Sequence, residues 1–82
     1  MTEFIILLSK CDAKLKRKKE GIKYYRFHFK GFYNGEKVEQ VQLLCSDEVN
    51  FIPDEDYLLK VKYENIINRV LFVNHVKSKK VI

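Results

Sequence analysis

The feature of the sequence that most constrains the fold is an Asn-Gly pair at residues 34 and 35. Both residue types accept the positive φ values of the tight turn that joins two antiparallel strands. The segment before it, residues 22–33, is rich in tyrosine and phenylalanine, and the segment after it, residues 36–45, carries Val38, Val41 and Leu43. Aromatic and β-branched side chains favour strands. The sequence therefore predicts a β-hairpin over residues 22–45.

Three further segments have strand-like patterns. Residues 2–13 include a run of apolar side chains from Phe4 to Leu8, which indicates a strand that is buried on both faces or shared across a closed barrel. Residues 57–64 alternate between apolar and polar side chains, as a half-buried strand does. After a turn at residues 65–69, residues 70–76 form the last predicted strand, and a basic tail follows.

The two remaining segments are predicted to connect these strands. Residues 14–21 have little apolar character and end in glycine, which is typical of an exposed loop. Residues 46–56 contain the only proline, so we expect a short helical turn that begins near Ser46 or Asp47 and ends before Pro53. Five strands in so short a chain would leave costly open edges unless the sheet closes. The predicted fold is therefore an all-β, five-stranded barrel with a short helix or turn between strands 3 and 4.

Length and composition limit the class of protein. The 82 residues suffice for one domain, 1–82, with one small core, and a core of this size leaves homodimer formation open. No apolar run approaches the ~18–20 residues of a membrane helix, and the basic residues follow the apolar run instead of preceding it as in a secretory signal. Cys11 and Cys45 are too few for a disulfide framework and are expected to be buried as small apolar side chains. We therefore expect a cytoplasmic protein with no membrane contact.

Charge is distributed unevenly along the chain. The net charge is +5, which favours acidic partners. Five cations lie within residues 14–19, and a second basic group comprises Lys77, Lys79 and Lys80. Five carboxylates fall together in another segment: Asp47, Glu48, Asp54, Glu55 and Asp56. The pattern predicts a molecule with a basic side and an acidic side.

The order of three strands, a short irregular or helical connection and two more strands resembles the oligonucleotide-binding (OB) fold. Within that fold, the chain looks most like the minimal single-stranded DNA-binding proteins, such as primosomal replication proteins. The resemblance implies a ligand that lies across strands 2 and 3, between the loops joining strands 1–2 and strands 4–5. It places the basic residues 14–21 in the first loop and residues 65–69 in the second, with the acidic segment at the far end of the barrel.

Strand 22–33 divides its side chains between two faces. One parity carries Lys23, Tyr25, Phe27, Phe29 and Tyr33, which we interpret as the core face. The other parity interleaves Tyr24 and Phe32 with three cationic or basic side chains. Proteins that bind single strands stack bases on aromatic rings and hold phosphates with cations. The alternative is that Tyr24 and Phe32 are ordinary packing partners or bury a dimer interface.

The residues predicted to bind nucleic acid therefore come from both loops and from strands 2 and 3. Lysines and arginines would hold phosphates, Tyr24 and Phe32 would stack bases, and the glutamines would contact base edges. The set is Lys14, Lys16, Arg17, Lys18, Lys19, Tyr24, Arg26, His28, Lys30, Phe32, Gln40, Gln42, Asn68 and Arg69. A solvated, solubilising role for the basic residues is the alternative interpretation.

No catalytic or metal-binding motif is present in the sequence. His28 and His75 are the only histidines, and no HxH, CxxC or HExxH spacing occurs. We predict no enzyme activity and no cofactor. The favoured hypothesis is a sequence-tolerant single-stranded nucleic-acid-binding module, with DNA favoured over RNA, that assists replication or recombination and contacts a replication protein. The alternatives are a protein-interaction module or inhibitor that docks on an acidic protein surface and, more remotely, a small basic ribonuclease.

Overall fold

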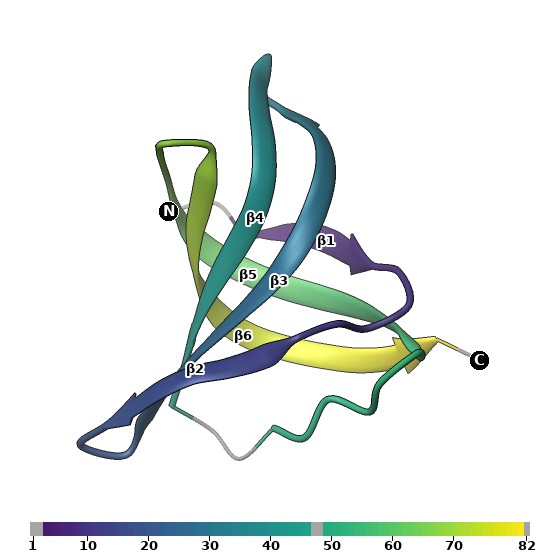
Figure 1. The fold of residues 1–82 in the computed structure, drawn as a ribbon, viewed down its shortest axis with the longest axis vertical. Helices are drawn as coiled ribbons and strands as arrows, with labels where there is room; N and C mark the ends of the chain where they lie inside the picture. Colours follow the sequence, from purple (N-terminus) through teal and green to yellow (C-terminus); the bar gives the residue numbers. More distant parts are fainter. Residues whose placement is uncertain (1–2, 47–48, 82) are drawn as a thin grey trace.

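The computed structural model describes residues 3–46 and 49–81, and these contain six β-strands and no helix (Figure 1). The prediction of an all-β protein is confirmed, although six strands are present where five were expected. The strands are β1 (Phe4–Leu8), β2 (Lys14–Lys19), β3 (Ile22–Tyr33), β4 (Glu36–Cys45), β5 (Asp56–Ile67) and β6 (Val70–Val81).

All six strands belong to one sheet, in the order β1-β5-β6-β4-β3-β2. Neighbouring strands are antiparallel except β4 and β6, which are parallel. The two strands at the ends of this order, β1 and β2, follow each other directly in the chain. Among the described residues no ladder pairs β1 with β2, so the hydrogen-bonded sheet has two ends.

The hairpin predicted over residues 22–45 is confirmed in both its strands and its turn. Asn34 and Gly35 have φ values of 50° and 81°, as a turn with two left-handed residues requires. Glu20–Gly21 joins β2 to β3, and Asn68–Arg69 joins β5 to β6, in turns that also have positive φ at both positions. The sequence predicts a turn within residues 65–69, which is confirmed, but it places Glu20 and Gly21 at the end of a longer loop, because Glu rarely adopts positive φ.

The prediction that residues 14–21 form an exposed loop is wrong. Lys14–Lys19 form β2, which pairs with the first part of β3. Most of this hairpin extends past the core, so its side chains are exposed and the segment lacks the apolar periodicity that identifies a strand. Pairing with β3, which is rich in strand-forming residues, outweighs the low strand propensity of lysine.

The last hairpin is longer than predicted at both ends. Asn65 belongs to β5, and the turn consists of Asn68 and Arg69 alone. Lys77, Lys79 and Lys80 were predicted to lie in a tail, but they belong to β6 and pair with the first residues of β5. Tertiary pairing along β5 therefore orders a stretch whose composition suggests a free tail.

The predicted helical turn is absent from the described part of residues 46–56. Asp47 and Glu48, where it would begin, lie outside the described residues. The Phe51 ring packs edge-on against the rings of Tyr25 and Tyr57, with both pairs of centroids 5.3 Å apart. The Tyr25 hydroxyl donates a 2.9 Å hydrogen bond to the Val49 carbonyl. The alternation of Val49 and Phe51 toward the core thus indicates an extended segment instead of a helix.

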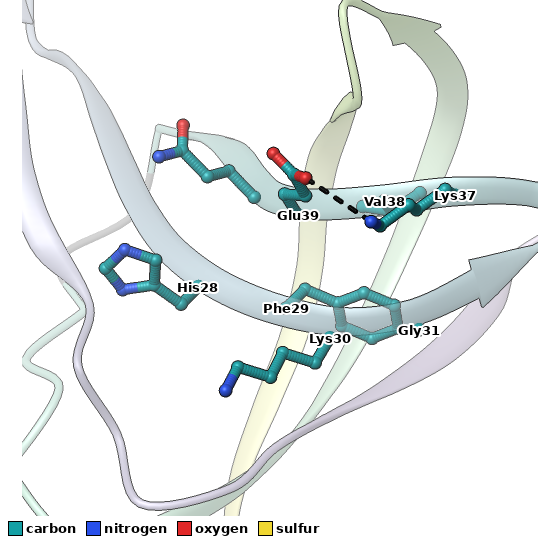
Figure 2. A pocket seen from close by; sticks show the side chains of 8 residues that line it. His28, Phe29, Lys30, Gly31, Lys37, Val38 and Glu39 are labelled. Atoms are coloured by element: carbon teal, nitrogen blue, oxygen red, sulfur yellow. Dashed lines mark ion pairs between the residues drawn. The ribbon is translucent and has the colours of Figure 1, made fainter.

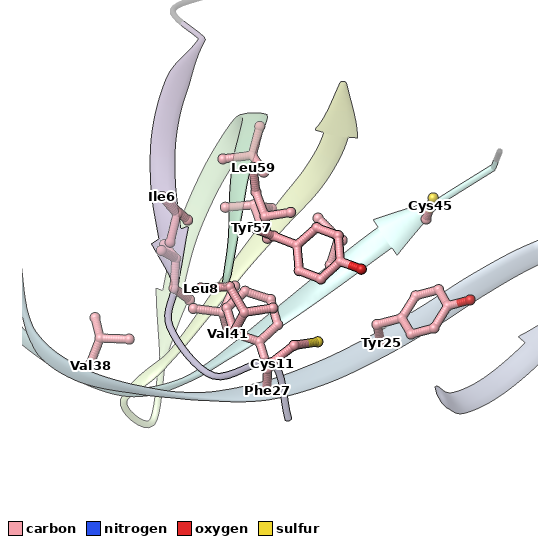
Figure 3. Close-up of a cluster of buried hydrophobic side chains, with 14 residues drawn as sticks. Ile6, Leu8, Cys11, Tyr25, Phe27, Val38, Val41, Cys45, Tyr57 and Leu59 are labelled. Carbon is pink, nitrogen blue, oxygen red and sulfur yellow. The ribbon is translucent and has the colours of Figure 1, made fainter. Parts of the chain in front are cut away.

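A single cluster of buried side chains fills the interior of the curved sheet (Figure 3). Its members come from every strand except β2, and Phe27, Val41, Leu43, Leu59 and Leu71 are among the most buried. The expected core parity of β3 is confirmed at Tyr25 and Phe27, whereas Phe29 and Tyr33 are only half-buried. The prediction that strand 1 is buried on both faces is wrong, because Ile5 and Leu7 are exposed. Cys11 and Cys45 are buried in the core, as expected for small apolar side chains.

Candidate nucleic-acid interface

The outer face of the sheet brings together side chains from five strands. Arg26 of β3 lies between Lys14 of β2 and Gln42 of β4 in the ladder. Gln42 in turn lies beside Phe72 of β6. A neighbouring row runs from Tyr24 through Leu44 and Asn74 to Lys62 of β5. Side chains that are paired across a ladder point to the same face, so these rows form one continuous surface.

This surface contains a shallow hollow of about 220 Å³ between β3 and β5. Aromatic side chains line much of it, and carboxamide side chains bring donors and acceptors to its wall. The lining residues are Tyr24, Gln42, Leu44, Tyr63, Asn65, Phe72, Val73 and Asn74. A flat apolar ligand edged with hydrogen-bonding groups matches this combination of chemistry.

Cations border the hollow on the side of β2 and β3. A register shift between Leu15 and Arg17 makes Lys16 the extra residue of a bulge, and the Lys16 Nζ donates a 3.2 Å hydrogen bond to the Gln42 Oε1 across β3. The Arg26 Nε is buried and has no hydrogen-bond partner. Within the described part of the chain, no carboxylate lies within ion-pair distance of Lys14, Lys16 or Arg26. Positive charge is therefore left uncompensated next to the hollow.

The other predicted cations of β2 follow Lys16 in the chain, but they do not all lie on the face that carries the hollow. Arg17 lies opposite Tyr24 in the ladder, and the position of its side chain lies outside the described part of the structure. Lys19 lies opposite Ile22 and so shares the parity of the outer face, whereas Lys18 lies opposite Lys23 on the other parity. The basic segment is thus divided between two faces of a strand, and only part of it adjoins the hollow.

Two predicted site residues are partly neutralised by acids that the sequence did not single out. The Nδ1 of His28 lies 2.6 Å from the Oδ2 of Asp12, and both Asp12 oxygens accept weaker hydrogen bonds from the His28 backbone N–H. Arg69 lies 3.2 Å from Glu39, which is also paired with Lys37 at 3.8 Å. Asn68 occupies the turn beside Arg69. This end of the face is therefore less basic than predicted.

The structure does not bring Phe32 and Lys30 close to Tyr24. A bulge after His28 shifts the register of β3, and Phe32 lies beyond it, opposite Lys37, with 73% of its surface exposed. Eight residues of strand separate Tyr24 from Phe32, a distance of roughly 25 Å. Around the bulge is a separate open hollow of about 600 Å³, lined by His28, Phe29, Lys30, Gly31, Lys37, Val38, Glu39 and Gln40 (Figure 2). Gln40 and His28 belong to this second hollow.

Sequence reasoning missed Phe72, Asn74 and Tyr63, and it did not include Asn65 among the binding residues. Residues 70–73 are apolar on both parities, so no alternation identifies which of them face outward. The burial of Leu71 and Val73 in the core directs Phe72 and Asn74 to the outer face. At Tyr63, positive φ (59°) and a register shift between Lys62 and Asn65 interrupt the alternation of β5.

The Cys11 and Tyr33 side chains have raised pKa values. Burial raises the pKa of the Cys11 thiol, which disfavours the reactive thiolate. Burial, with a hydrogen bond to Glu64, raises the pKa of Tyr33 to about 12. Among the described residues, no group of three or more His, Cys, Asp or Glu side chains is placed to hold a metal ion.

Comparisons with known proteins identify no relative: no family model, no curated protein and no solved structure matches the chain. In the part of the chain that the structure describes, there is no helix with the length and hydropathy that a membrane crossing requires. The inference about function therefore depends on the geometry and charge of the outer face.

Proposed function

We propose that the chain is a sequence-tolerant single-stranded nucleic-acid-binding module of OB-like architecture, and that it prefers DNA to RNA. The observation that carries this proposal is the aromatic and carboxamide-lined hollow of Tyr24, Phe72 and Asn74, bordered by the uncompensated cations Lys14 and Arg26. In proteins that bind single strands, aromatic rings stack bases and cations hold the backbone.

The strand order supports the OB-like part of the proposal. If β1 and β2 are counted as two halves of one interrupted strand, the sheet has five strands, and the halves of the first strand lie at its two ends. This order is compatible with a partly open barrel in which residues 9–13 connect the two end strands. The parallel pairing of β4 with β6 gives it a Greek-key connection of the kind found in this fold.

The hollow also lies on the face that corresponds to the ligand-binding face of an OB fold. The turn at Glu20–Gly21, between β2 and β3, projects at the lower left of Figure 1, and the turn at Asn68–Arg69 lies at the upper left. The outer face of β3 and β4 lies between these two turns, which correspond to the loops that flank the ligand in an OB fold. Lys14 and Lys16 lie along the first of these hairpins.

Single strands fit this surface better than a duplex does. Bases within a duplex are stacked on one another and cannot place a face against Tyr24 or Phe72. The hollow, at about 220 Å³, is large enough for one unstacked base and too small for a base pair with its backbone. Because every base has a π-face, stacking of this kind tolerates any sequence.

The test is fluorescence anisotropy of labelled single-stranded DNA, duplex DNA and single-stranded RNA with the wild-type protein and the Phe72→Ala variant. We expect the wild type to prefer single-stranded DNA. Phe72→Ala should lose about 1–3 kcal/mol of binding free energy, the usual contribution of one stacked base. Phe32→Ala is the matched control, since it removes an aromatic ring that lies far from the hollow.

The melting temperature of each variant shows whether it is folded, and so distinguishes a loss of binding from a loss of folding. If Phe72→Ala and Phe32→Ala lost equal amounts of binding free energy, the stacking surface would extend to the tip of the β3–β4 hairpin. Absence of binding to every oligonucleotide at low salt, with the protein folded, would overturn the proposal. A role in replication or recombination is part of the proposal and would follow from binding to the single-stranded DNA that these processes expose.

A further inference from the structure

The outward side chains of β1 form an apolar surface distinct from the hollow. Ile5 and Leu7 have 65% and 54% of their surfaces exposed. Leu7 pairs in the ladder with Leu58 of β5, which is 39% exposed. Three aliphatic side chains therefore lie next to one another on the outer face of the sheet. Contiguous exposed apolar side chains often mark an interaction site.

Three lysines adjoin these side chains on the same face. Ile5 lies opposite Lys60, and Lys60 lies opposite Lys77 of β6. Leu58 lies opposite Lys79, and both Lys77 and Lys79 are exposed. We call this surface the β1 patch; it comprises Ile5, Leu7, Leu58, Lys60, Lys77 and Lys79.

The charge of the β1 patch is only partly compensated. Glu3 lies 3.7 Å from Lys60, and among the described residues no carboxylate lies within ion-pair distance of Lys77 or Lys79. Lys80, by contrast, lies 3.9 Å from Glu55. The patch therefore combines aliphatic surface with a net positive charge.

This combination favours an acidic peptide over other occupants. The apolar side chains are branched aliphatics, whereas nucleic-acid bases are held by aromatic rings. A second copy of the chain packed over the same patch would bring the lysines of both copies into one interface, and like charges disfavour such an interface. A partner segment that alternates carboxylates with aliphatic side chains complements both parts of the patch.

Contacts at both ends of β1 disfavour a strand added along its free edge. The Phe4 ring stacks on the Tyr33 ring with centroids 4.9 Å apart, which holds the end of β3 beside the start of β1. Beyond the other end of β1, Asp12 is hydrogen-bonded to His28 of β3. Between them lies a cleft of about 350 Å³ lined by residues of both sides, including Leu7 and Phe29. The outward side chains are therefore more accessible to a partner than the strand edge.

We propose that the β1 patch is a docking site for an acidic, aliphatic peptide segment of a partner protein. The inference does not depend on nucleic-acid binding, because the patch and the hollow occupy different halves of the β5–β6 hairpin. Register shifts between Lys60 and Val61 and between Lys62 and Asn65 separate the two halves. Both ligands should therefore bind at the same time.

The test uses a short fluorescein-labelled peptide in which leucine and isoleucine alternate with aspartate and glutamate. We expect saturable binding to the wild type and a loss of about tenfold or more in affinity for the Ile5→Gln, Leu7→Gln double variant, which removes aliphatic surface without changing charge. Leu15→Gln is the matched control, because Leu15 is 53% exposed on β2 and lies outside the patch. Its peptide affinity should equal that of the wild type.

A second variant keeps the proposal testable if the first one folds poorly. Lys77→Glu with Lys79→Glu should lower the affinity for the acidic peptide by about tenfold. The same variant should raise the affinity for a peptide in which lysines replace the acidic residues. Circular dichroism melting confirms folding in each case. Peptide binding that is unchanged in both double variants, or absent in the wild type, would overturn the proposal.

Two other results would also overturn it. Sedimentation velocity that detects a dimer dissociated by Ile5→Gln with Leu7→Gln, in a protein that binds no peptide, would identify the patch as an interface between copies. Binding to vesicles of phosphatidylserine and phosphatidylcholine that requires Lys77 and Lys79, again without peptide binding, would identify it as a membrane-contact surface.

Discussion

The two strands at the ends of the sheet differ in nearly every side chain. β1 has the sequence FIILL, and β2 has the sequence KLKRKK. β1 contributes Ile6 and Leu8 to the core, whereas β2 contributes no residue to it. Yet the two are consecutive in the chain and occupy equivalent positions at the ends of the strand order.

The difference shows two ways of managing a strand that has a neighbour on one side only. Lysines along an edge strand discourage pairing with another molecule, and β2 follows that rule. β1 lacks such charges, and its ends are instead held by the Phe4–Tyr33 stack and by the Asp12–His28 hydrogen bond beyond it. The chemistry beside each strand therefore differs, with exposed cations at β2 and an aliphatic surface at β1.

The largest effect expected from this contrast concerns stability. Leu8 of β1 is 2% exposed and Leu15 of β2 is 53% exposed, although both are leucines in edge strands. Leu8→Ala should lower the free energy of unfolding by about 2–5 kcal/mol, because it leaves a cavity in the core. Leu15→Ala should lower it by less than about 1 kcal/mol. Urea denaturation measures both, and similar losses would mean that β2 is as integral to the fold as β1.

The next effect concerns nucleic-acid binding. If Lys14 and Lys16 each contact a phosphate, Lys14→Ala with Lys16→Ala should reduce the slope of log affinity against log salt by about 1.4, since single strands give about 0.7 per contact. Lys77→Ala with Lys79→Ala removes the same charge from the β1 patch and should leave the slope nearly unchanged. Anisotropy titrations over a range of salt concentrations measure both slopes. Equal reductions of the slope in the two double variants would show that the contribution of a lysine to nucleic-acid binding does not depend on its position.

The same contrast explains how much of the fold could be predicted from the sequence. The β3–β4 hairpin was predicted with its boundaries, because Asn34-Gly35 and the aromatic residues of β3 carry the information locally. β2 was missed because its own side chains make few apolar contacts and so show no strand pattern. Its strand conformation comes from pairing with β3, whose residues favour strands. A strand of this kind is specified by its neighbour, so a single-sequence pattern does not reveal it.

The candidate site was predictable only where alternation was clear. Tyr24, Arg26 and Gln42 were identified because β3 and β4 alternate between apolar and polar residues, and the structure brings all three next to the hollow or its border. Phe72 could not be assigned a face, because residues 70–73 are apolar on both parities. Phe32 was assigned to the site from parity alone, but it lies two residues before the Asn34–Gly35 turn, near the tip of the hairpin and eight positions along β3 from Tyr24.

A smaller effect tests the contact that holds the start of β1. The Tyr33 pKa is raised from 10.0 to about 12, first by burial and then by its hydrogen bond to Glu64. Between these two pH values the unfolded chain loses the Tyr33 proton while the folded chain keeps it, so the free energy of unfolding falls as pH rises. Tyr33→Phe should remove this part of the pH dependence. Urea denaturation of both proteins from just below pH 10 to just below pH 12 gives the difference between their free energies of unfolding. Because both proteins carry the same lysines, the effect of lysine titration cancels in this difference.

The expected result is that the stability advantage of the wild type over Tyr33→Phe shrinks across this range. A constant difference would mean that Tyr33 titrates at the same pH in both states and that its ring is not shielded beside Phe4. The contact at the start of β1 would then be weaker than the 4.9 Å stack indicates.

The smallest effect concerns Asp12, which lies in the segment that joins β1 to β2. Its carboxylate lies 2.6 Å from the His28 ring and lines the cleft of about 350 Å³ between β1 and β3. Asp12→Asn keeps the shape and removes the charge, so single-stranded DNA should bind about threefold more tightly at low salt if the strand passes this end of the face. The gain should vanish at high salt, where screening removes the contribution of one exposed charge. An unchanged affinity at low salt would confine the bound strand to the hollow of Tyr24 and Phe72, and would place the β1 side of the molecule outside the path of the nucleic acid.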